Sequence, residues 1–546
     1  MKIALAQLNY HIGNFRKNTD KILEALAKAK NQKADLVIFA ELAVSGYPPR
    51  DFLEFDDFVQ RCENSIREIA KACNGIAALV GAPAFNPNYE GKDLFNAAYF
   101  LEDGKIKAVH HKSLLPNYDI FDEYRYFEPG NEVHTQEFQG KKLAITICED
   151  IWNVGNDPLY THNPMDKLYE ENPDLIINIA ASPFNYQQNE RRKEILKKNL
   201  EKYKLPLFYI NHVGAQTELL FDGGSMVLSG SGGIVDELAY FGEDLKVYDL
   251  DKLQELEDAG YKEVEIPETE RIHKALLMGI RNYFEKLGFK KAILGLSGGI
   301  DSAVTFCLAA EALGKENVYG LLMPSKFSSE HSIADAETLA RNLGCRYDTI
   351  PISDTYQSFM DDLSPYFENK PFDIAEENIQ ARIRGVLLMA LSNKFGYILL
   401  NTSNKSEAAV GYATLYGDMN GGLSVLGDVY KTQVFELARY INREQEIIPE
   451  NTISKPPSAE LRPDQKDSDS LPDYDLLDRI LYQYIEMRKG PEEIVRQGFD
   501  KEIVAKTLRL VNTTEYKRHQ TPPILRVSPK AFGMGRRMPI VAKYLA

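Results

Sequence analysis

Two short segments of the chain carry residues whose types and spacing could do chemistry. In "AITICEDIW", residues 144–152, Cys148 directly follows an apolar run and precedes two carboxylates. A cysteine after a strand is usually an inert packing residue, and it becomes a nucleophile only when a base and a positive charge activate it. In "LGLSGGIDSAV", residues 294–304, a glycine-rich turn separates an apolar run from a predicted helix. The two segments indicate two different sites on one chain.

The glycine-rich turn is suited to binding phosphate. Its glycines let the backbone approach an anion closely, and the N–H groups at the start of the following helix favour negative charge. No lysine follows the glycines, so the turn is not a Walker loop, whose lysine grips the terminal phosphates. Asp301, at the predicted helix start, could hold a divalent cation that bridges phosphates. The residues of the turn that could contact phosphate are Gly295, Leu296, Ser297, Gly298, Gly299, Ile300, Asp301 and Ser302.

The lysine-free turn resembles the pyrophosphate-binding loop of the PP-loop ATP pyrophosphatases, which cleave ATP between its α- and β-phosphates and adenylate a substrate. The resemblance implies that residues 295–302 contact ATP. The alternative is a purely structural turn, but further segments resemble NAD synthetases. One of them departs from the family pattern, because Ser403 stands where glycine is usual. The resembling segments are "EENIQARIRG" (376–385), "NTSNKSEAAVGYATLYGD" (401–418), "VYKTQVFELA" (429–438), 455–478, 515–523 and 532–540.

The resemblance to NAD synthetases implies roles for residues beyond the turn. Thr402 comes just after a predicted strand, where a parallel α/β sheet binds its ligand, and is expected to contact ATP. Mg²⁺ prefers few carboxylates together with phosphate oxygens, and Asp301 and Glu407 are its expected ligands. Lys431 is expected to neutralise phosphate. The implied deamido-NAD⁺ contacts are Asn378, Glu407 and Lys517.

A synthetase of this kind needs a nitrogen nucleophile, and free ammonia is mostly protonated at neutral pH. Glutamine hydrolysis at Cys148 would supply it. The segments around the cysteine resemble the three catalytic segments of the nitrilase superfamily, although Ala40 stands where many relatives have proline. The resemblance implies that Glu41 is the base, that Lys112 stabilises thiolate and oxyanion, and that Cys148 is the nucleophile. The three segments are "FAELAVSGYPP" (39–49), "HKSLLPNYDIFDEYRYF" (111–127) and "ITICEDIW" (145–152).

The same resemblance implies a glutamine pocket near the cysteine. Glu123 matches a second glutamate that positions the substrate or the lysine, and Arg191 stays open as an alternative to Arg192. His212, in "NHVG", is the only histidine plausible for an alternative Cys-His-Glu triad, and it is weakly placed. No role is assigned to Asp150. The expected glutamine contacts are Tyr47, Tyr118, Glu123, Ser182 and Arg192.

Together these resemblances predict a glutamine-hydrolysing NAD synthetase that uses Mg²⁺ and ATP. It would convert deamido-NAD⁺, ATP, L-glutamine and water to NAD⁺, AMP, pyrophosphate and L-glutamate, through a Cys148 thioester and an adenylated dinucleotide. Three alternatives stay open: another PP-loop amidoligase, an RNA-thiolating enzyme, and a scaffold without activity. The blocks "NTSNKSE" and "SAELRPDQ" argue against the first, the acidic charge against the second, and the intact catalytic residues against the third.

The elements between these segments predict the fold. Short apolar runs alternate with amphipathic helical segments, which is the pattern of layered α/β domains. For the first part the resemblance implies a four-layer α-β-β-α nitrilase-like sandwich, and the second part indicates a doubly wound parallel sheet of the Rossmann-like PP-loop kind. We expect a glutamine amidohydrolase domain at 1–245, an acidic linker at 246–270 and a synthetase domain with a C-terminal extension at 271–546.

Bulk composition narrows the partners. The 546 residues are 44% hydrophobic and 26% charged, which fits two or three globular domains. The net charge of −16 argues against a general nucleic-acid binder, and no apolar run approaches the roughly 18 residues of a membrane span. Five scattered cysteines and the lack of a signal-peptide pattern predict a cytoplasmic location. The expected partners are small molecules, with no nucleic acid and no membrane, and further copies of the chain in a homo-oligomer.

Overall fold

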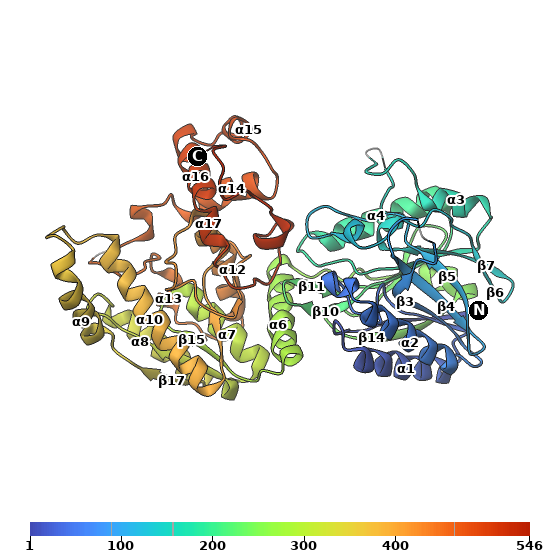
Figure 1. Ribbon diagram of the computed structural model, residues 1–546, viewed down its shortest axis with the longest axis horizontal. Coiled ribbons are helices and arrows are strands. Elements are labelled where there is room, and N and C mark those ends of the chain that lie inside the picture. The colour runs from blue at the N-terminus through green and yellow to red at the C-terminus, as the bar shows by residue number, and fades with distance from the viewer. Residues whose placement is uncertain (89, 156–157, 464, 546) are drawn as a thin grey trace. The chain divides into compact units, whose positions relative to one another are not determined.

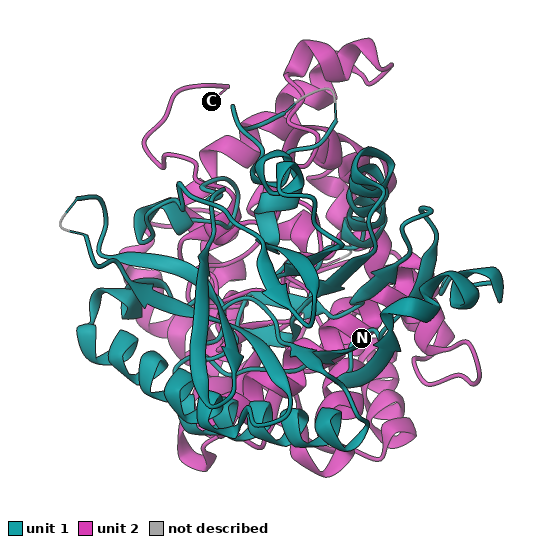
Figure 2. Cartoon of the chain, turned by 90° about the vertical axis from the view of Figure 1, so that its right-hand side faces the viewer, with its two compact units in different colours: residues 1–265 teal, residues 266–546 magenta. Residues whose placement is uncertain are grey.

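The computed structural model describes residues 1–88, 90–155, 158–463 and 465–545, so residue 464 of the predicted block 455–478 lies outside the described residues. The chain divides into two compact units, residues 1–265 and 266–546 (Figure 2). The segment 246–270, predicted as a linker, contributes the end of strand β14 and helix α5 to the first unit. The assignment of glutamine hydrolysis to 1–245 and of synthesis to 271–546 stays a prediction.

Two six-stranded mixed sheets form the centre of the first unit. Their strand orders are β14-β1-β2-β3-β4-β5 and β13-β12-β9-β8-β7-β6. In each sheet the three central strands run parallel, and the strands toward the edges pair antiparallel. The strands are β1 (Lys2–Gln7), β2 (Leu36–Ile38), β3 (Ala77–Phe85), β4 (Leu94–Glu102), β5 (Lys105–His111), β6 (Gln136–Phe138), β7 (Lys141–Ile147), β8 (Leu175–Ile179), β9 (Leu207–Ile210), β12 (Met226–Leu228), β13 (Ile234–Glu237) and β14 (Asp244–Asp249).

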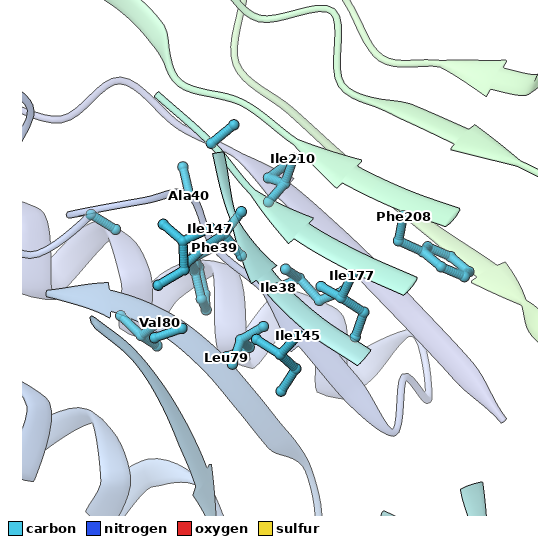
Figure 3. Close-up of a cluster of buried hydrophobic side chains, with 14 of the residues drawn as sticks. Ile38, Phe39, Ala40, Leu79, Val80, Ile145, Ile147, Ile177, Phe208 and Ile210 are labelled. Carbon is cyan, nitrogen blue, oxygen red and sulfur yellow. The ribbon is translucent and has the colours of Figure 1, made fainter. Parts of the chain in front are cut away.

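The two sheets enclose one apolar core. Ile38 and Leu79 from the first sheet and Ile145 and Ile177 from the second lie in the same buried cluster (Figure 3). Every residue of β8 is buried, because the strand is covered on both faces, and four of its five residues are apolar. This core holds the strand ends that carry the predicted catalytic residues.

Helices cover the outer faces of both sheets. Helix α2 packs on β3 and β4, and it buries Phe58, Cys62, Ile66 and Ile69 at helical spacing (Figure 1). Helix α3 packs on β7 and completes the α-β-β-α order, which confirms the predicted sandwich. The helices and the remaining hairpin are α1 (Phe15–Asn31), α2 (Asp56–Ala72), α3 (Pro164–Glu170), α4 (Gln188–Tyr203), α5 (Leu253–Asp258), β10 (Val213–Gln216) and β11 (Leu219–Asp222). Single-turn helices η2 (Glu123–Arg125) and η3 (Cys148–Ile151) carry predicted site residues.

The second unit is built on one parallel sheet. Its strand order is β17-β16-β15-β18-β19, so the chain moves outward from β15 in one direction and then returns to the other side of it. This is the doubly wound order predicted from the sequence, and its switch point lies between β15 and β18. The strands are β15 (Ala292–Gly295), β16 (Val318–Leu322), β17 (Arg346–Thr349), β18 (Ile398–Asn401) and β19 (Leu423–Ser424).

Helices flank this sheet on both faces. On one face α10 packs on β15 and β18, where Ile293, Leu388 and Leu399 share a buried cluster. On the other, α7 packs on β15 and β16 and also contacts α6 and α12 (Figure 1). In the described ranges no helix is long and apolar enough to cross a membrane. The main helices are α6 (Glu268–Leu287), α7 (Ile300–Leu313), α8 (Glu330–Leu343), α9 (Ser353–Leu363), α10 (Ile374–Phe395), α11 (Lys405–Val410), α12 (Lys431–Ile441), α13 (Glu450–Ser454), α14 (Tyr474–Ile485), α15 (Pro491–Arg496), α16 (Lys501–Thr513) and α17 (Glu515–Arg518).

Candidate active sites

Three strand ends of the first unit bring the predicted triad together. Glu41 lies just beyond β2, Lys112 directly after β5, and Cys148 directly after β7. The side chains of Glu41 and Lys112 are 0% exposed, and Cys148 is 5% exposed. The ends of β2, β5 and β7 therefore carry a buried acid, a buried cation and a buried thiol.

Lys112 binds two carboxylates at once. Its Nζ lies 2.7 Å from Glu41 Oε1 and 2.8 Å from Glu123 Oε2. Burial acts to lower the pKa of Lys112, but the charges of Glu123 and Glu41 outweigh it and hold that pKa well above its usual value. Burial raises the pKa of Glu123 to about 7, although Lys112 acts against it. The ammonium group is thus held charged inside the protein.

The Glu41 carboxylate is fixed on both oxygens. Oε1 also accepts from the side chain of Asn96 at 2.7 Å, and Oε2 accepts from the backbone N–H of Ala181 at 2.9 Å. The ring nitrogen Nε2 of His212 lies 2.6 Å from the backbone carbonyl of Glu41. His212 therefore supports the backbone of the acid, and this contact gives no support to the alternative Cys-His-Glu triad.

The backbone that carries Glu41 passes close to β3. A Cβ atom on Gly81 would lie 2.5 Å from the Ala40 carbonyl, so the glycine in β3 makes room for this crossing.

Cys148 sits in a strained position at the start of η3. Its φ is +42°, a left-handed conformation that non-glycine residues adopt at a cost. Burial raises the pKa of the thiol well above its ordinary value, Glu41 raises it further, and Lys112 lowers it. The thiol therefore carries its proton at neutral pH.

Three of the residues predicted to bind glutamine form hydrogen bonds with other side chains. Tyr47 donates to Glu123 at 2.9 Å, and Tyr118 donates to Glu149 at 2.9 Å. The Ser182 hydroxyl accepts from Gln188 at 3.3 Å, which makes Gln188 a neighbour that the sequence did not indicate. Beyond these contacts, the glutamine assignments stay predictions.

The two candidate arginines differ in their surroundings. Arg192 is 0% exposed, and its guanidinium binds Asp222 Oδ1 at 2.9 Å and the Gly223 carbonyl at 3.2 Å. Arg191 is exposed, with its guanidinium 5.6 Å from the centre of the Trp152 ring. Arg192 thus forms a buried ion pair with Asp222, and it is also the residue predicted to contact glutamine.

In the second unit a cavity of about 250 Å³ opens at the carboxyl ends of β15 and β18. The predicted ATP contacts Gly295, Leu296, Ser297 and Thr402 line it, at the position where a doubly wound sheet binds ligands. Arg384 also lines the cavity; it belongs to the segment 376–385 that resembles NAD synthetases, but it was not predicted as a contact. Burial lowers the pKa of Arg384 to about 10.

The glycine-rich turn is closely packed beside this cavity. Gly298 has φ +80°, and a Cβ atom there would lie 2.2 Å from the backbone oxygen of Ser332. The Ser297 and Ser302 hydroxyls lie 3.2 Å apart. Gly299 caps the N-terminus of α7, whose first residues are Ile300 and Asp301. Within the turn, the Gly299 N–H donates to the Ser297 hydroxyl at 3.1 Å and the Ser302 hydroxyl donates to the Gly299 carbonyl at 2.9 Å, and phosphate binding by the turn stays a prediction.

The predicted metal ligands meet at one lysine. Lys431 Nζ contacts Asp301 Oδ2 and lies 3.2 Å from Glu407 Oε1, and Asn404 donates to Asp301 Oδ1 at 2.9 Å. Burial raises the pKa of Glu407 to about 8, although Lys431 lowers it. Two carboxylates from α7 and α11 thus converge on the Lys431 ammonium, and the binding of Mg²⁺ by them stays a prediction.

Two of the three predicted dinucleotide contacts, Asn378 and Lys517, meet around the segment 411–414. Lys517 Nζ donates to the carbonyls of Gly411 and Ala413, each at 2.7 Å. Asn378 accepts from the Thr414 hydroxyl at 2.7 Å. Burial lowers the pKa of Lys517. Both residues thus hold the segment 411–414, and their contact with deamido-NAD⁺ stays a prediction.

Comparison with known proteins matches both units. Residues 2–258 match the carbon–nitrogen hydrolase family, and residues 272–521 match the NAD synthase family. The chain is 47% identical to the glutamine-dependent NAD(+) synthetase of Synechocystis sp., covering 99% of each chain. The chain belongs to the glutamine-dependent NAD(+) synthetase family. Family membership confirms the predicted class of enzyme, while the roles of individual residues stay predictions.

Two solved structures extend the family likeness to three dimensions. The glutamine-dependent NAD⁺ synthetase of Acinetobacter baumannii in complex with ADP is 41% identical, with a TM-score of 0.78 over 99% of this chain and 98% of that one. The enzyme of Cytophaga hutchinsonii has a TM-score of 0.83 over the same shares at 21% identity, which speaks for the fold alone. The glutamine-dependent NAD(+) synthetase family therefore shares both units of this chain.

Proposed function

We propose that the chain makes NAD⁺ from deamido-NAD⁺ and ATP with nitrogen taken from L-glutamine, releasing AMP, pyrophosphate and L-glutamate. The observation that carries the proposal is the buried contact of Lys112 with Glu41 and Glu123 at the strand ends that also carry Cys148. An isolated structural cysteine does not need a buried acid and a buried cation beside it. The lysine-free phosphate turn of the second unit would bind the ATP that activates deamido-NAD⁺, and the activated carboxylate would then consume the ammonia.

Glutamine hydrolysis would begin at the protonated thiol. Glu41 takes the proton from Cys148 as the sulfur attacks the side-chain carbonyl carbon of glutamine, which forms a carbon–sulfur bond and a negatively charged oxygen. Lys112 and the backbone N–H of Glu149 stabilise that oxyanion. The carbon–nitrogen bond then breaks, Glu41 gives its proton to the leaving nitrogen, and ammonia departs from a thioester on Cys148.

Hydrolysis of the thioester would regenerate the enzyme. Glu41 takes a proton from water as the water oxygen attacks the thioester carbon. The carbon–sulfur bond breaks, the proton returns to sulfur, and L-glutamate leaves. Asn96 and the Ala181 N–H fix the carboxylate of Glu41, so the same base can serve both steps without reorienting.

Synthesis in the second unit would follow the chemistry of adenylation. The N–H groups of the turn 295–302 bind phosphate, and Thr402 lies at the same cavity. The carboxylate of deamido-NAD⁺ attacks the α-phosphorus of ATP and expels pyrophosphate. Ammonia then attacks the acyl-adenylate carbon and expels AMP, which yields the amide of NAD⁺. Asn378, Glu407 and Lys517 are the proposed dinucleotide contacts.

Asp301 and Glu407 fit a magnesium ion. Their carboxylates converge on Lys431, and among the described residues no group of three His, Cys, Asp or Glu forms a fuller metal cage. Mg²⁺ suits such a site because it takes most of its ligands from phosphates and water. When bound, Mg²⁺ would neutralise charge on the phosphates of ATP.

We further propose a homo-oligomer located in the cytoplasm. All five cysteines lie in described residues and none forms a disulfide, as expected for a reducing compartment. The apparent mass of the full-length protein by light scattering tests the first point. A mass near the 61.8 kDa of one chain at micromolar concentration would contradict an oligomer.

A Cys148→Ala variant tests the division of labour. We expect glutamine-dependent NAD⁺ formation to fall at least about a thousandfold, because no thioester can form. Synthesis with added ammonium chloride should stay within about twofold of wild type, because the second unit is unchanged. The measurement is the rate of NAD⁺ formation with each nitrogen source.

Cys62→Ala is the matched control, because Cys62 is equally buried but lies on α2 away from the triad. It should keep both activities. Loss of the ammonium-dependent activity in Cys148→Ala would contradict the proposed separation of the two chemistries.

A further inference from the structure

Asp150 is a buried carboxylate to which the mechanism above gives no task. Its side chain is 3% exposed. Oδ1 accepts hydrogen bonds from the backbone N–H groups of Ser113 at 3.0 Å and Leu114 at 2.8 Å. Oδ2 accepts from the backbone N–H of Ile147 at 3.0 Å. Three main-chain donors from two segments therefore converge on one side chain.

The donors flank two catalytic residues. Ser113 and Leu114 directly follow Lys112, and Ile147 directly precedes Cys148. Lys112 comes from the edge strand β5 of one sheet, and Cys148 follows β7 of the other. The Asp150 carboxylate thus joins the two sheets at the point where the cation and the nucleophile leave them.

We propose that Asp150 is a positioning residue that sets the distance and orientation of Lys112 relative to Cys148 during glutamine hydrolysis. The inference rests on the proposed glutaminase function. Cys148 has a strained φ of +42°, and such a conformation persists only where surrounding contacts determine it. Charge-assisted bonds from a carboxylate to backbone N–H groups are strong enough to supply that constraint. A misplacement of about 1 Å between reacting groups can lower a rate about a hundredfold.

The requirement is for a carboxylate and not merely for a polar side chain. Asparagine has one acceptor oxygen, so Asp150→Asn leaves its NH₂ group facing either Ile147 N–H or the pair from Ser113 and Leu114. Asp150→Ala loses all three bonds. The inference therefore predicts a graded loss, larger in the alanine variant.

The same strand provides a matched control. Asp174 Oδ2 accepts from the backbone N–H of Lys142 at 2.8 Å, at the beginning of β7, whereas Asp150 binds Ile147 at its end. Asp174→Asn perturbs a comparable carboxylate-to-backbone bond on the same strand. It should leave the geometry at Cys148 unchanged.

The test compares three readouts in the full-length protein. For Asp150→Asn we expect the kcat of glutamate release to fall at least about a hundredfold with KM within about threefold, because the substrate pocket is intact. The second readout is the rate at which iodoacetamide alkylates Cys148 as a function of pH, followed by mass spectrometry of the tryptic peptide. The pH midpoint of this rate profile should rise by about one pH unit or more. Ammonium-dependent NAD⁺ formation and all Asp174→Asn rates should stay within about threefold of wild type. A folded Asp150→Asn protein with unchanged glutaminase kcat and alkylation profile would overturn the inference.

A second measurement covers the case in which Asp150→Asn does not fold. In the unmodified protein, amide hydrogen exchange at Ser113 and Leu114 should be at least about a hundredfold slower than in an unstructured chain, since Asp150 holds both groups. Exchange at unstructured rates would contradict the inference. Cys148→Ala separates the two levels: if it keeps glutamine hydrolysis, the proposed function fails, whereas normal kinetics in Asp150→Asn alone refute only the role of Asp150.

Discussion

At the scale of single residues, the first unit concentrates ionisable groups in its buried interior. Lys112, Glu41 and Glu123 are buried together, and each is held by a contact of opposite charge. Removing one member would leave another buried and unpaired, which is costly. The site is therefore held together by its own electrostatics as well as by the surrounding strands.

The pKa of Asp150 predicts a pH dependence of stability. Burial raises that pKa to about 6 from an ordinary value near 3.8, although the backbone donors act against it. The folded protein then binds more protons than the unfolded chain between about pH 4 and pH 6, so this group's contribution to stability falls as pH rises through that window. Two pKa units correspond to about 3 kcal/mol.

Comparison with Asp150→Asn isolates this contribution. The free energy of unfolding of the first unit, measured by denaturant titration, should fall between pH 4 and pH 7 by up to about 3 kcal/mol more in wild type than in the variant. Asp174→Asn, at a residue before β8 whose side chain binds the beginning of β7, should follow the wild-type curve over this range. Parallel curves for wild type and Asp150→Asn would show that Asp150 titrates normally.

At the scale of elements, both sites lie where strands end and turns begin. The turn 295–302 joins β15 to α7 at the switch point of the parallel sheet, which is where such sheets bind nucleotides. Cys148 follows β7 on a single helical turn. The rigid strands fix these turns, and the turns hold the groups to which the chemistry is assigned.

Gly298→Ala tests the phosphate turn as an element. The added methyl group would meet the Ser332 backbone oxygen at 2.2 Å in a left-handed conformation, so the turn must shift. We expect ammonium-dependent NAD⁺ formation to fall at least about a hundredfold, because backbone N–H groups would leave their places around the phosphates.

The control for this substitution is Gly396→Ala at the end of α10. Gly396 has φ +68°, but a Cβ atom there meets no atom within 4 Å. It should cost about 1 kcal/mol of stability and leave synthesis unchanged. Equal activities of the two variants would show that crowding at Ser332 is unimportant.

At the scale of the whole molecule, one chain carries the source of ammonia and its consumer. Glutaminase turnover without synthesis would waste glutamine, and ammonia released into water would become ammonium. We therefore expect occupancy of the synthetase site by ATP and deamido-NAD⁺ to raise the rate of glutamine hydrolysis about fivefold or more, within the usual range of coupling between sites.

The measurement is glutamate release by wild-type protein with and without the two nucleotide substrates. Cys148→Ala supplies the background rate. Gly298→Ala should abolish the stimulation while retaining basal hydrolysis. Identical rates with and without ATP and deamido-NAD⁺ would count against coupling.

The sequence by itself determined the class of the chain and its chemically active residue types. The short apolar runs and helical segments predicted two α/β layouts, because periodicity and strand–helix alternation are local properties of the chain. The motifs around Glu41, Lys112, Cys148 and "SGGIDS" indicated both chemistries for the same reason. Each motif keeps its spacing whether or not the chain is folded.

Only the tertiary structure decided how these residues are held. Asn96, which binds Glu41, and Asp222, which binds Arg192, belong to no motif and are distant in sequence from their partners. Asp150 stands beside Cys148 in sequence, yet its contacts with Ser113 and Leu114 exist only once the two sheets pack together. Long-range contacts depend on packing of the whole core, and a motif carries no information about which backbone group will lie opposite it.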